Sequence, residues 1–257
     1  MPALNRKNVL AIVAHELRAP LGSVLNTVEL MRQAERSEPR FAAWLDMVDR
    51  QTRHMSRLVD DLLDATRISR NGLKLHKERM DFREPVDAAL EAISPFVEIR
   101  GHKLDVERCI DPIWVDGDAT RLQQVVANLL LNSVEYTERG GCIDVKLERL
   151  SSLVVLRVRD NGIGIVPEAL DRIFEPFTRS CTSFRSGHEG LGIGLAVVRS
   201  VVEQHGGVVE AKSAGLYRGS EFIVRLPTLP GGSACVASSL SSASGMDRMK
   251  GVPAVSC

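Results

Sequence analysis

Residues 6–33 of this 257-residue chain read RKNVLAIVAHELRAPLGSVLNTVELMRQ, and their apolar positions recur with a helical period. A second apolar stripe runs through residues 40–70, and a short polar break ending in Pro39 separates the two segments. Two such stripes joined by a short turn predict an antiparallel helical hairpin. Because two helices bury little apolar surface by themselves, we expect the hairpin to dimerise into a four-helix bundle. The first stripe consists of Val9, Val13, Leu17, Pro20, Val24, Val28 and Met31.

After Asn71-Gly72 the apolar period changes, and helical patterns mix with alternating ones. In one strand pattern, apolar Ile143, Val145 and Leu147 alternate with charged residues. Segregated helices and antiparallel-looking strands predict an α+β fold, in which an α/β two-layer sandwich follows the hairpin. The expected helices lie near 84–99, 118–136 and 191–205, and the expected strands near 143–148, 153–158 and 222–226.

These patterns divide the chain into three expected parts. The hairpin covers residues 1–72 and the sandwich domain covers residues 73–227. The remaining residues, 228–257, are rich in Gly, Ser and Ala, a composition that predicts disorder.

Composition excludes several classes of function. Lys+Arg and Asp+Glu number 33 each, so the chain has no net basic field that would attract nucleic acid. No run of about 18 apolar residues predicts a membrane span. The five cysteines are scattered without CxxC or Cys/His spacing, which disfavours zinc and favours a reducing, cytoplasmic setting.

His15 lies about 180° from the middle of the first apolar stripe, so its side chain is expected to face solvent. Pro20 lacks an N–H group, and we expect the helix to bend or loosen just after His15. A lone histidine on a polar face is ordinarily a solvated side chain. Here the adjacent carboxylate of Glu16 could accept a ring proton and leave the other nitrogen more nucleophilic.

Three further stretches carry possible chemistry. Asn128 and Asn132 are four residues apart on one expected helix face, and an amide oxygen is a suitable Mg²⁺ ligand. Asp160 follows a strand and could accept a hydrogen bond from an exocyclic amine, and the neighbouring glycines allow close backbone approach. The stretch GLGIGL, residues 190–195, opens a helix whose N–H groups could bind phosphate. Taken singly, these are ordinary surface amides, a turn and a glycine-rich loop.

The stretch HELRAPL, residues 15–21, resembles the H-box of the sensor histidine kinases of two-component systems. The resemblance implies that His15 is the phospho-acceptor and that Glu16 is its general base. The family often has Thr or Asn where this chain has Ala19, and that polar residue is associated with dephosphorylation of the partner regulator.

The three stretches, in this order, resemble the N, G1 and G2 boxes of the Bergerat-type ATPase domain. Histidine kinases share this domain with type II topoisomerases, Hsp90-type chaperones and MutL-type repair proteins. Residues 173–177, IFEPF, resemble the F-box of histidine kinases, and 165–189 correspond to a lid over the nucleotide. The family commonly has Lys or Arg where this chain has Glu135, so ATP affinity is expected to be reduced if that carboxylate faces the site. The resemblance implies that Asn132 ligates Mg²⁺, Asn128 supports the triphosphate, Tyr136 lies near the nucleotide, Asp160 holds the adenine amine, Gly162 and Gly164 shape the pocket floor, and Gly190, Gly192, Gly194 and Leu195 lie by the phosphates.

These resemblances imply ATP-dependent autophosphorylation on His15, followed by transfer to an aspartate in the receiver domain of a response regulator. They also imply a homodimer and an input signal that comes from a separate sensor protein or from a longer chain. Two alternatives stay open at this point. One is a GHKL-type ATPase that hydrolyses ATP to drive conformational change. The other is a non-catalytic dimerisation module with a decayed nucleotide site, suggested by Ala19 and Glu135.

Overall fold

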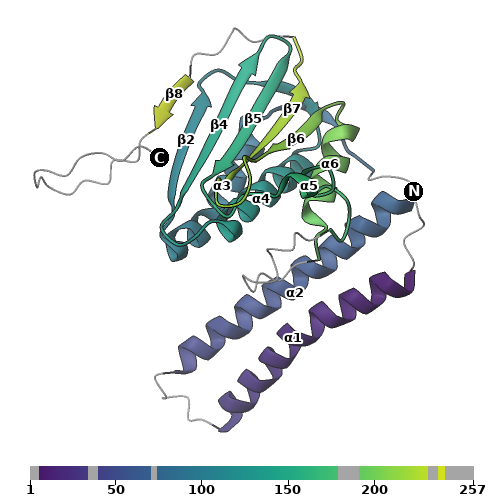
Figure 1. Cartoon of the computed structure of the whole chain (residues 1–257), viewed down its shortest axis with the longest axis vertical. Helices are drawn as coiled ribbons and strands as arrows, with labels where there is room; N and C mark the ends of the chain where they lie inside the picture. Colours follow the sequence, from purple (N-terminus) through teal and green to yellow (C-terminus); the bar gives the residue numbers. More distant parts are fainter. Residues whose placement is uncertain (1–5, 34–39, 71–73, 179–190, 231–236, 241–257) are drawn as a thin grey trace, which may run out of the picture. The chain divides into compact units, whose positions relative to one another are not determined.

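The computed structural model describes residues 6–33, 40–70, 74–178, 191–230 and 237–240. The described helices include none that is long and apolar enough to cross a membrane. In chain order the elements in Figure 1 are α1 (Arg6–Gln33), α2 (Phe41–Arg70), β1 (Glu78–Asp81), α3 (Arg83–Arg100), β2 (Lys103–Cys109), β3 (Trp114–Gly117), α4 (Ala119–Tyr136), β4 (Cys142–Leu150), β5 (Leu153–Asp160), α5 (Pro167–Leu170), α6 (Gly194–Gln204), β6 (Val208–Lys212), β7 (Ser220–Pro227) and β8 (Ala237–Leu240).

The chain divides into two compact units. One comprises Met1–Gly72 and Glu175–Val197, and the other comprises Leu73–Phe174 and Val198–Cys257. The first contains the helical hairpin, and the second contains the sheets together with α3, α4, α5 and the greater part of α6.

Helices α1 and α2 form the antiparallel hairpin that the sequence predicts (Figure 1). They meet at Thr27, which is buried and whose hydroxyl donates to the Ser23 carbonyl at 2.8 Å and lies 3.1 Å from the Met47 sulfur. The expected loosening near Pro20 does not interrupt the secondary structure, because α1 is α-helical throughout Arg6–Gln33.

The hairpin leaves large apolar side chains exposed. On α1, Leu21 and Leu25 are four residues apart and therefore share one face of the helix. On α2, Leu45, Val59 and Leu63 also share a face, because 14 and 18 residues are close to whole numbers of helical turns. These five side chains are between 45% and 61% exposed in the single chain.

The second unit is built on a six-stranded sheet with the order β6-β7-β5-β4-β2-β8, and helices α3 and α4 cover one of its faces (Figure 1). Strand β2 pairs with β4 in parallel, whereas the other pairs are antiparallel. The parallel pair includes β2, a strand that the sequence patterns did not predict. The chain passes through α4 between β2 and β4, and such a crossover brings the second strand back in the same direction.

The alternation predicted for residues 143–148 is confirmed. Ile143, Val145 and Leu147 are at most 1% exposed and form part of the core. On the opposite face of the sheet, Lys146 on β4 pairs with Glu107 on β2 at 3.4 Å, so this face carries charges suited to water.

Several elements were not expected from the sequence. Strands β1 and β3 form a separate two-stranded antiparallel sheet. Strands β2 and β6 and the short helix α5 were also missed. Strand β8 lies within the segment expected to be disordered, and it pairs antiparallel with β2 from Cys109↔Ala237 to Val106↔Leu240.

Candidate active site

Asp160 is a buried carboxylate at the end of β5, with an exposed fraction of 5%. Its Oδ1 accepts hydrogen bonds from the backbone N–H groups of Gly162 at 2.9 Å and Ser220 at 3.3 Å. Its Oδ2 accepts from the Ser220 hydroxyl at 2.6 Å. Burial raises the pKa of Asp160, although these hydrogen bonds act in the opposite direction.

Ser220 is a member of this site that sequence reasoning missed. It begins β7 and lies opposite Asp160 in the antiparallel register of β5 and β7. The only sequence signal is a hydroxyl residue at the start of a strand, and this signal gains meaning only when the register is known.

Two buried hydroxyl groups lie at the C-terminal end of α4. Ser133 and Thr137 are 1% and 2% exposed, and neither hydroxyl has a hydrogen-bond partner within the described part of the chain. The Ser133 hydroxyl lies close enough to Asp160 to lower the pKa of that carboxyl, but the two groups are not aligned as a hydrogen bond. Buried hydroxyl groups ordinarily have partners, so the Ser133 hydroxyl beside Asp160 indicates a polar ligand or a water molecule at the site.

The loop after β5 is held between two other segments. Ile163 donates its N–H to the Tyr136 carbonyl at the end of α4, at 3.0 Å. On the other side, Tyr217 in the loop between β6 and β7 donates to the Ile163 carbonyl at 2.7 Å.

Neither glycine of this loop has room for a side chain. A Cβ on Gly162 would lie 2.2 Å from the Tyr136 carbonyl oxygen. Gly164 has a φ of +68°, and a Cβ there would lie 2.1 Å from the Gly215 oxygen. The close backbone approach predicted for this stretch is therefore present.

Helix α4 carries the two asparagines on a half-buried face, while Leu122, Leu129 and Leu130 of the same helix are fully buried. Asn128 and Asn132 lie one turn apart on it. The described residues include no group of three or more His, Cys, Asp or Glu side chains that could hold a metal ion.

The glycine-rich stretch belongs to the other compact unit. Gly192 has a φ of +67° and accepts a hydrogen bond from the N–H of Phe177 at 2.9 Å. A Cβ on Gly192 would lie 2.8 Å from the Thr178 oxygen. Gly194 begins α6 and Leu195 is half-buried, whereas Gly190 lies outside the described residues, as does 179–189 of the expected lid.

His15 and Glu16 lie on α1, and their side chains are outside the described part of the structure. The solvent-facing orientation of His15 accordingly stays a prediction.

The stretch 173–177 contributes a buried aromatic residue. Phe174 is 5% exposed and makes an edge-to-face contact with Phe222, with ring centroids 6.4 Å apart. The Arg199 guanidinium lies 4.6 Å from the centroid of the Phe174 ring. This contact fixes the end of the segment that leads from α5 to Phe174.

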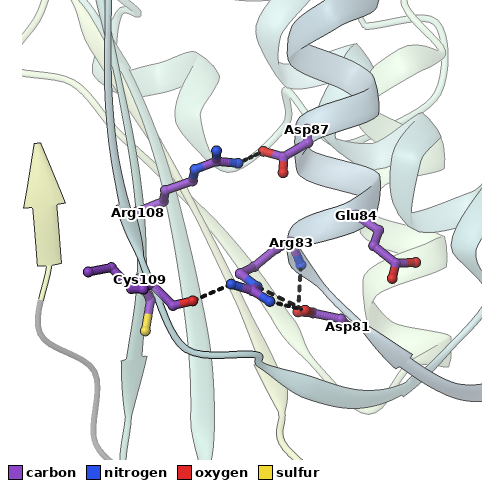
Figure 2. Close-up of a pocket in the computed structure, with 7 residues that line it drawn as sticks. Asp81, Arg83, Glu84, Asp87, Arg108 and Cys109 are labelled. Atoms are coloured by element: carbon purple, nitrogen blue, oxygen red, sulfur yellow. Dashed lines mark hydrogen bonds and ion pairs between the residues drawn. The ribbon is translucent and has the colours of Figure 1, made fainter. Parts of the chain in front are cut away.

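A separate polar pocket of about 400 Å³ lies where β2 ends and α3 begins (Figure 2). Its arginines are already paired, Arg83 with Asp81 through 2.8 Å and 2.6 Å hydrogen bonds and Arg108 with Asp87. Strand register places this pocket at the opposite end of the sheet from Asp160. Asp160 pairs with Ile143 on β4, and Ile143 pairs with Leu104 at the start of β2, whereas the pocket lies at the end of β2. The pocket is therefore no part of the Asp160 site. Its lining residues are Asp81, Arg83, Glu84, Asp87, Arg108, Cys109 and Ile110.

Comparison with known families agrees with this geometry. The family described as "Histidine kinase-, DNA gyrase B-, and HSP90-like ATPase" matches residues 117–230, which include Asp160 and α4. The family described as "His Kinase A (phospho-acceptor) domain" matches residues 5–71, which include His15.

Whole-chain comparisons give the same families. The histidine protein kinase DivJ of Caulobacter vibrioides is 31% identical over 230 residues, covering 88% of this chain and 38% of DivJ. The chain thus spans well under half the length of this relative. Full-length ShkA, solved in complex with AMPPNP, has a TM-score of 0.62 at 25% identity, covering 91% of this chain and 47% of ShkA. The histidine kinase ThkA, solved with the response regulator protein TrrA, has a TM-score of 0.63 at 23% identity, covering 87% and 62% of the two chains, and shows the fold alone.

Proposed function

We propose that this chain, which belongs to the sensor histidine kinases of two-component systems, transfers the γ-phosphoryl group of ATP to its own His15. The phosphoryl group would then pass to an aspartate of a response regulator. One observation carries the proposal. It is the buried Asp160 carboxylate beside the buried Ser133 hydroxyl, which has no hydrogen-bond partner among the described residues, within the segment that matches the ATPase family.

The chemistry of Asp160 supports an adenine nucleotide. Its Oδ2 accepts one hydrogen bond, from Ser220, and a carboxylate oxygen can accept a second from the exocyclic amine of adenine. Guanine would present a carbonyl oxygen at the same position and be repelled. The Ser133 hydroxyl could bond a ring nitrogen directly or through a water molecule. The relative ShkA was solved with AMPPNP, an analogue of ATP, which agrees with this assignment.

The remaining predicted residues would handle the triphosphate. Asn132 would hold Mg²⁺ together with phosphate and water oxygens, and Asn128 would support the triphosphate. When bound, Mg²⁺ neutralises phosphate charge. Gly192, Gly194 and Leu195, at the start of α6, would offer backbone N–H groups to the phosphates.

In the transfer itself, one imidazole nitrogen of His15 would attack the γ-phosphorus of ATP. A nitrogen–phosphorus bond forms, the bond from that phosphorus to the bridging oxygen breaks, and ADP leaves. Glu16 would take the proton from the other ring nitrogen. The receiver aspartate would later accept the phosphoryl group and restore the histidine.

The exposed apolar faces of the hairpin support a homodimer as the working form. ThkA was solved with a response regulator, and we assign the same class of partner to this chain.

The test is incubation of the chain with γ-³²P-labelled ATP and Mg²⁺, followed by mapping of the labelled residue. We expect label that is stable in base and lost in acid, and that is absent from His15→Gln.

In Asp160→Asn we expect ATP affinity to fall about 10- to 100-fold, because hydrogen bonds to a charged group are worth roughly 1.5–3 kcal/mol. Label that persists in His15→Gln would contradict the assignment of His15. Failure of the wild-type chain to bind ATP at millimolar concentration in calorimetry would support a decayed nucleotide site instead.

A further inference from the structure

A buried histidine joins the ends of two helices in the sheet-containing unit. His205, which follows α6, is 5% exposed. Its Nε2 accepts a hydrogen bond from the backbone N–H of Asp118 at 3.0 Å, at the start of α4. Its Nδ1 donates to the Val201 carbonyl at 2.7 Å. Because an N–H group only donates and a carbonyl only accepts, these partners require a neutral ring with its proton on Nδ1.

Asp118 extends this connection to the segment that enters the unit. It is the N-cap of α4, and its Oδ1 accepts from the Arg121 N–H at 3.1 Å. Its Oδ2 accepts from the His76 N–H at 2.9 Å. The next residue, Lys77, donates its ammonium to the Gln204 carbonyl at 2.6 Å, at the C-terminal end of α6.

The packing around this network is tight. A Cβ on Gly117 would lie 2.5 Å from the Leu122 side chain and 3.5 Å from the His205 ring. The start of α4 therefore lies beside the ring, with no room for a side chain between Gly117 and Leu122. Since interiors are close-packed, these contacts couple the position of α4 to that of α6.

Both helices carry residues assigned to the nucleotide. Asn128 and Asn132 lie farther along α4, and α6 begins at Gly194. The segment around His76 and Lys77 follows the hairpin helix α2 in the chain. One hydrogen-bonded network thus holds the N-terminal end of one helix, the C-terminal end of the other and the segment between hairpin and sheet.

We propose that His205 is a positioning residue for nucleotide binding. Its neutral ring fixes the start of α4 relative to the end of α6 through two hydrogen bonds. Asp118 and Lys77 connect the same two helix ends to the segment at His76 and Lys77. The proposal rests on the proposed function only in assigning α4 and α6 to the nucleotide. It predicts that a change in this segment is transmitted to nucleotide affinity.

Protonation would reverse the role of Nε2, because a doubly protonated ring would point a donor at the Asp118 N–H. Burial lowers the pKa of His205 and the Lys77 ammonium lowers it further, whereas the hydrogen bond to the Val201 carbonyl and the carboxylates of Asp118 and Asp116 act in the opposite direction. The net shift is downward, so the ring is neutral at pH 7, and acid pH favours the form that cannot accept from the Asp118 N–H.

The experiment titrates the full chain with Mg-AMPPNP in a calorimeter and follows hydrogen exchange at the Asp118 amide. In His205→Leu we expect affinity to fall at least 10-fold and the amide to exchange at least 100-fold faster. In His205→Gln, whose Oε1 can replace Nε2 as acceptor, affinity should stay within 3-fold of wild type. Lys74→Met is the matched control, since Lys74 is exposed and outside the network.

A pH series keeps the test decisive if His205→Leu does not fold. As pH falls through the range in which NMR shows the His205 ring to titrate, wild-type affinity should fall more steeply than that of His205→Gln, which cannot protonate at this position. A folded His205→Leu with wild-type affinity and exchange would overturn the proposal, as would parallel pH profiles for wild type and His205→Gln across that titration. None of these readouts involves His15. Failed phosphorylation would therefore contradict the proposed function alone, and amide exchange would show whether His205 holds the start of α4 even in a chain that bound no nucleotide.

Discussion

At Asp160, burial and hydrogen bonding act on one carboxylate in opposite directions. Burial raises its pKa, and the contacts from Ser220 and Gly162 lower it without fully compensating. A carboxylate kept ionised in such a place costs stability, which is characteristic of residues retained for binding.

This balance predicts a pH dependence of stability. The folded-state pKa of Asp160 lies above its ordinary value of 3.8, so between these two values the folded chain binds more protons than the unfolded chain. The contribution of Asp160 to the free energy of unfolding therefore decreases as pH rises through this window. Relative to wild type, Asp160→Asn should gain stability as pH rises through the window and keep that gain at neutral pH.

Urea unfolding of both proteins from pH 3 to pH 7 measures this difference. An advantage of Asp160→Asn that shrinks as pH rises would contradict the direction given for this pKa.

At the scale of elements, the loop after β5 depends on the loop between β6 and β7. Gly219 donates its N–H to the Gly162 carbonyl at 3.1 Å. A Cβ on Gly219 would lie 2.0 Å from the backbone carbonyl oxygen of Asp160. The second loop therefore positions the first through backbone contacts that leave no room for a side chain.

Gly219→Ala should destabilise the fold by at least about 3 kcal/mol, because left-handed strain of roughly 1–2 kcal/mol is added to a backbone clash. Gly140→Ala is the matched control, since Gly140 also has a positive φ, +80°, but a Cβ there meets nothing within 4 Å. Its cost should be the strain alone. Equal midpoints for the two variants in denaturant unfolding would show that the contact with Asp160 carries no energy.

At the scale of the whole molecule, the exposed apolar faces of the hairpin predict self-association. We expect light scattering to give twice the mass of one chain, and Leu25→Glu with Leu45→Glu to weaken association at least 100-fold by placing charges in an apolar interface. Asn26→Glu, which adds a charge at an exposed neighbouring position of α1, is the control. A monomeric wild type at micromolar concentration would contradict the dimer, and so would a double variant that still associates as wild type does.

The sequence by itself determined the hairpin, the alternating strand at 143–148, the helix that carries Asn128 and Asn132, and the turn after Asp160. Each is a local pattern, because helical period, alternation and turn glycines are set by residues close together in the chain. The order of these motifs then indicated the family, which the comparisons confirm.

The tertiary structure alone decided which distant residues meet. Ser220 reaches Asp160 through the register of β5 and β7, and His205 reaches Asp118 because the ends of two helices pack together. The parallel pairing of β2 with β4 has the same origin. Strand register and helix packing depend on contacts throughout the core, so they cannot be predicted from any single stretch of sequence.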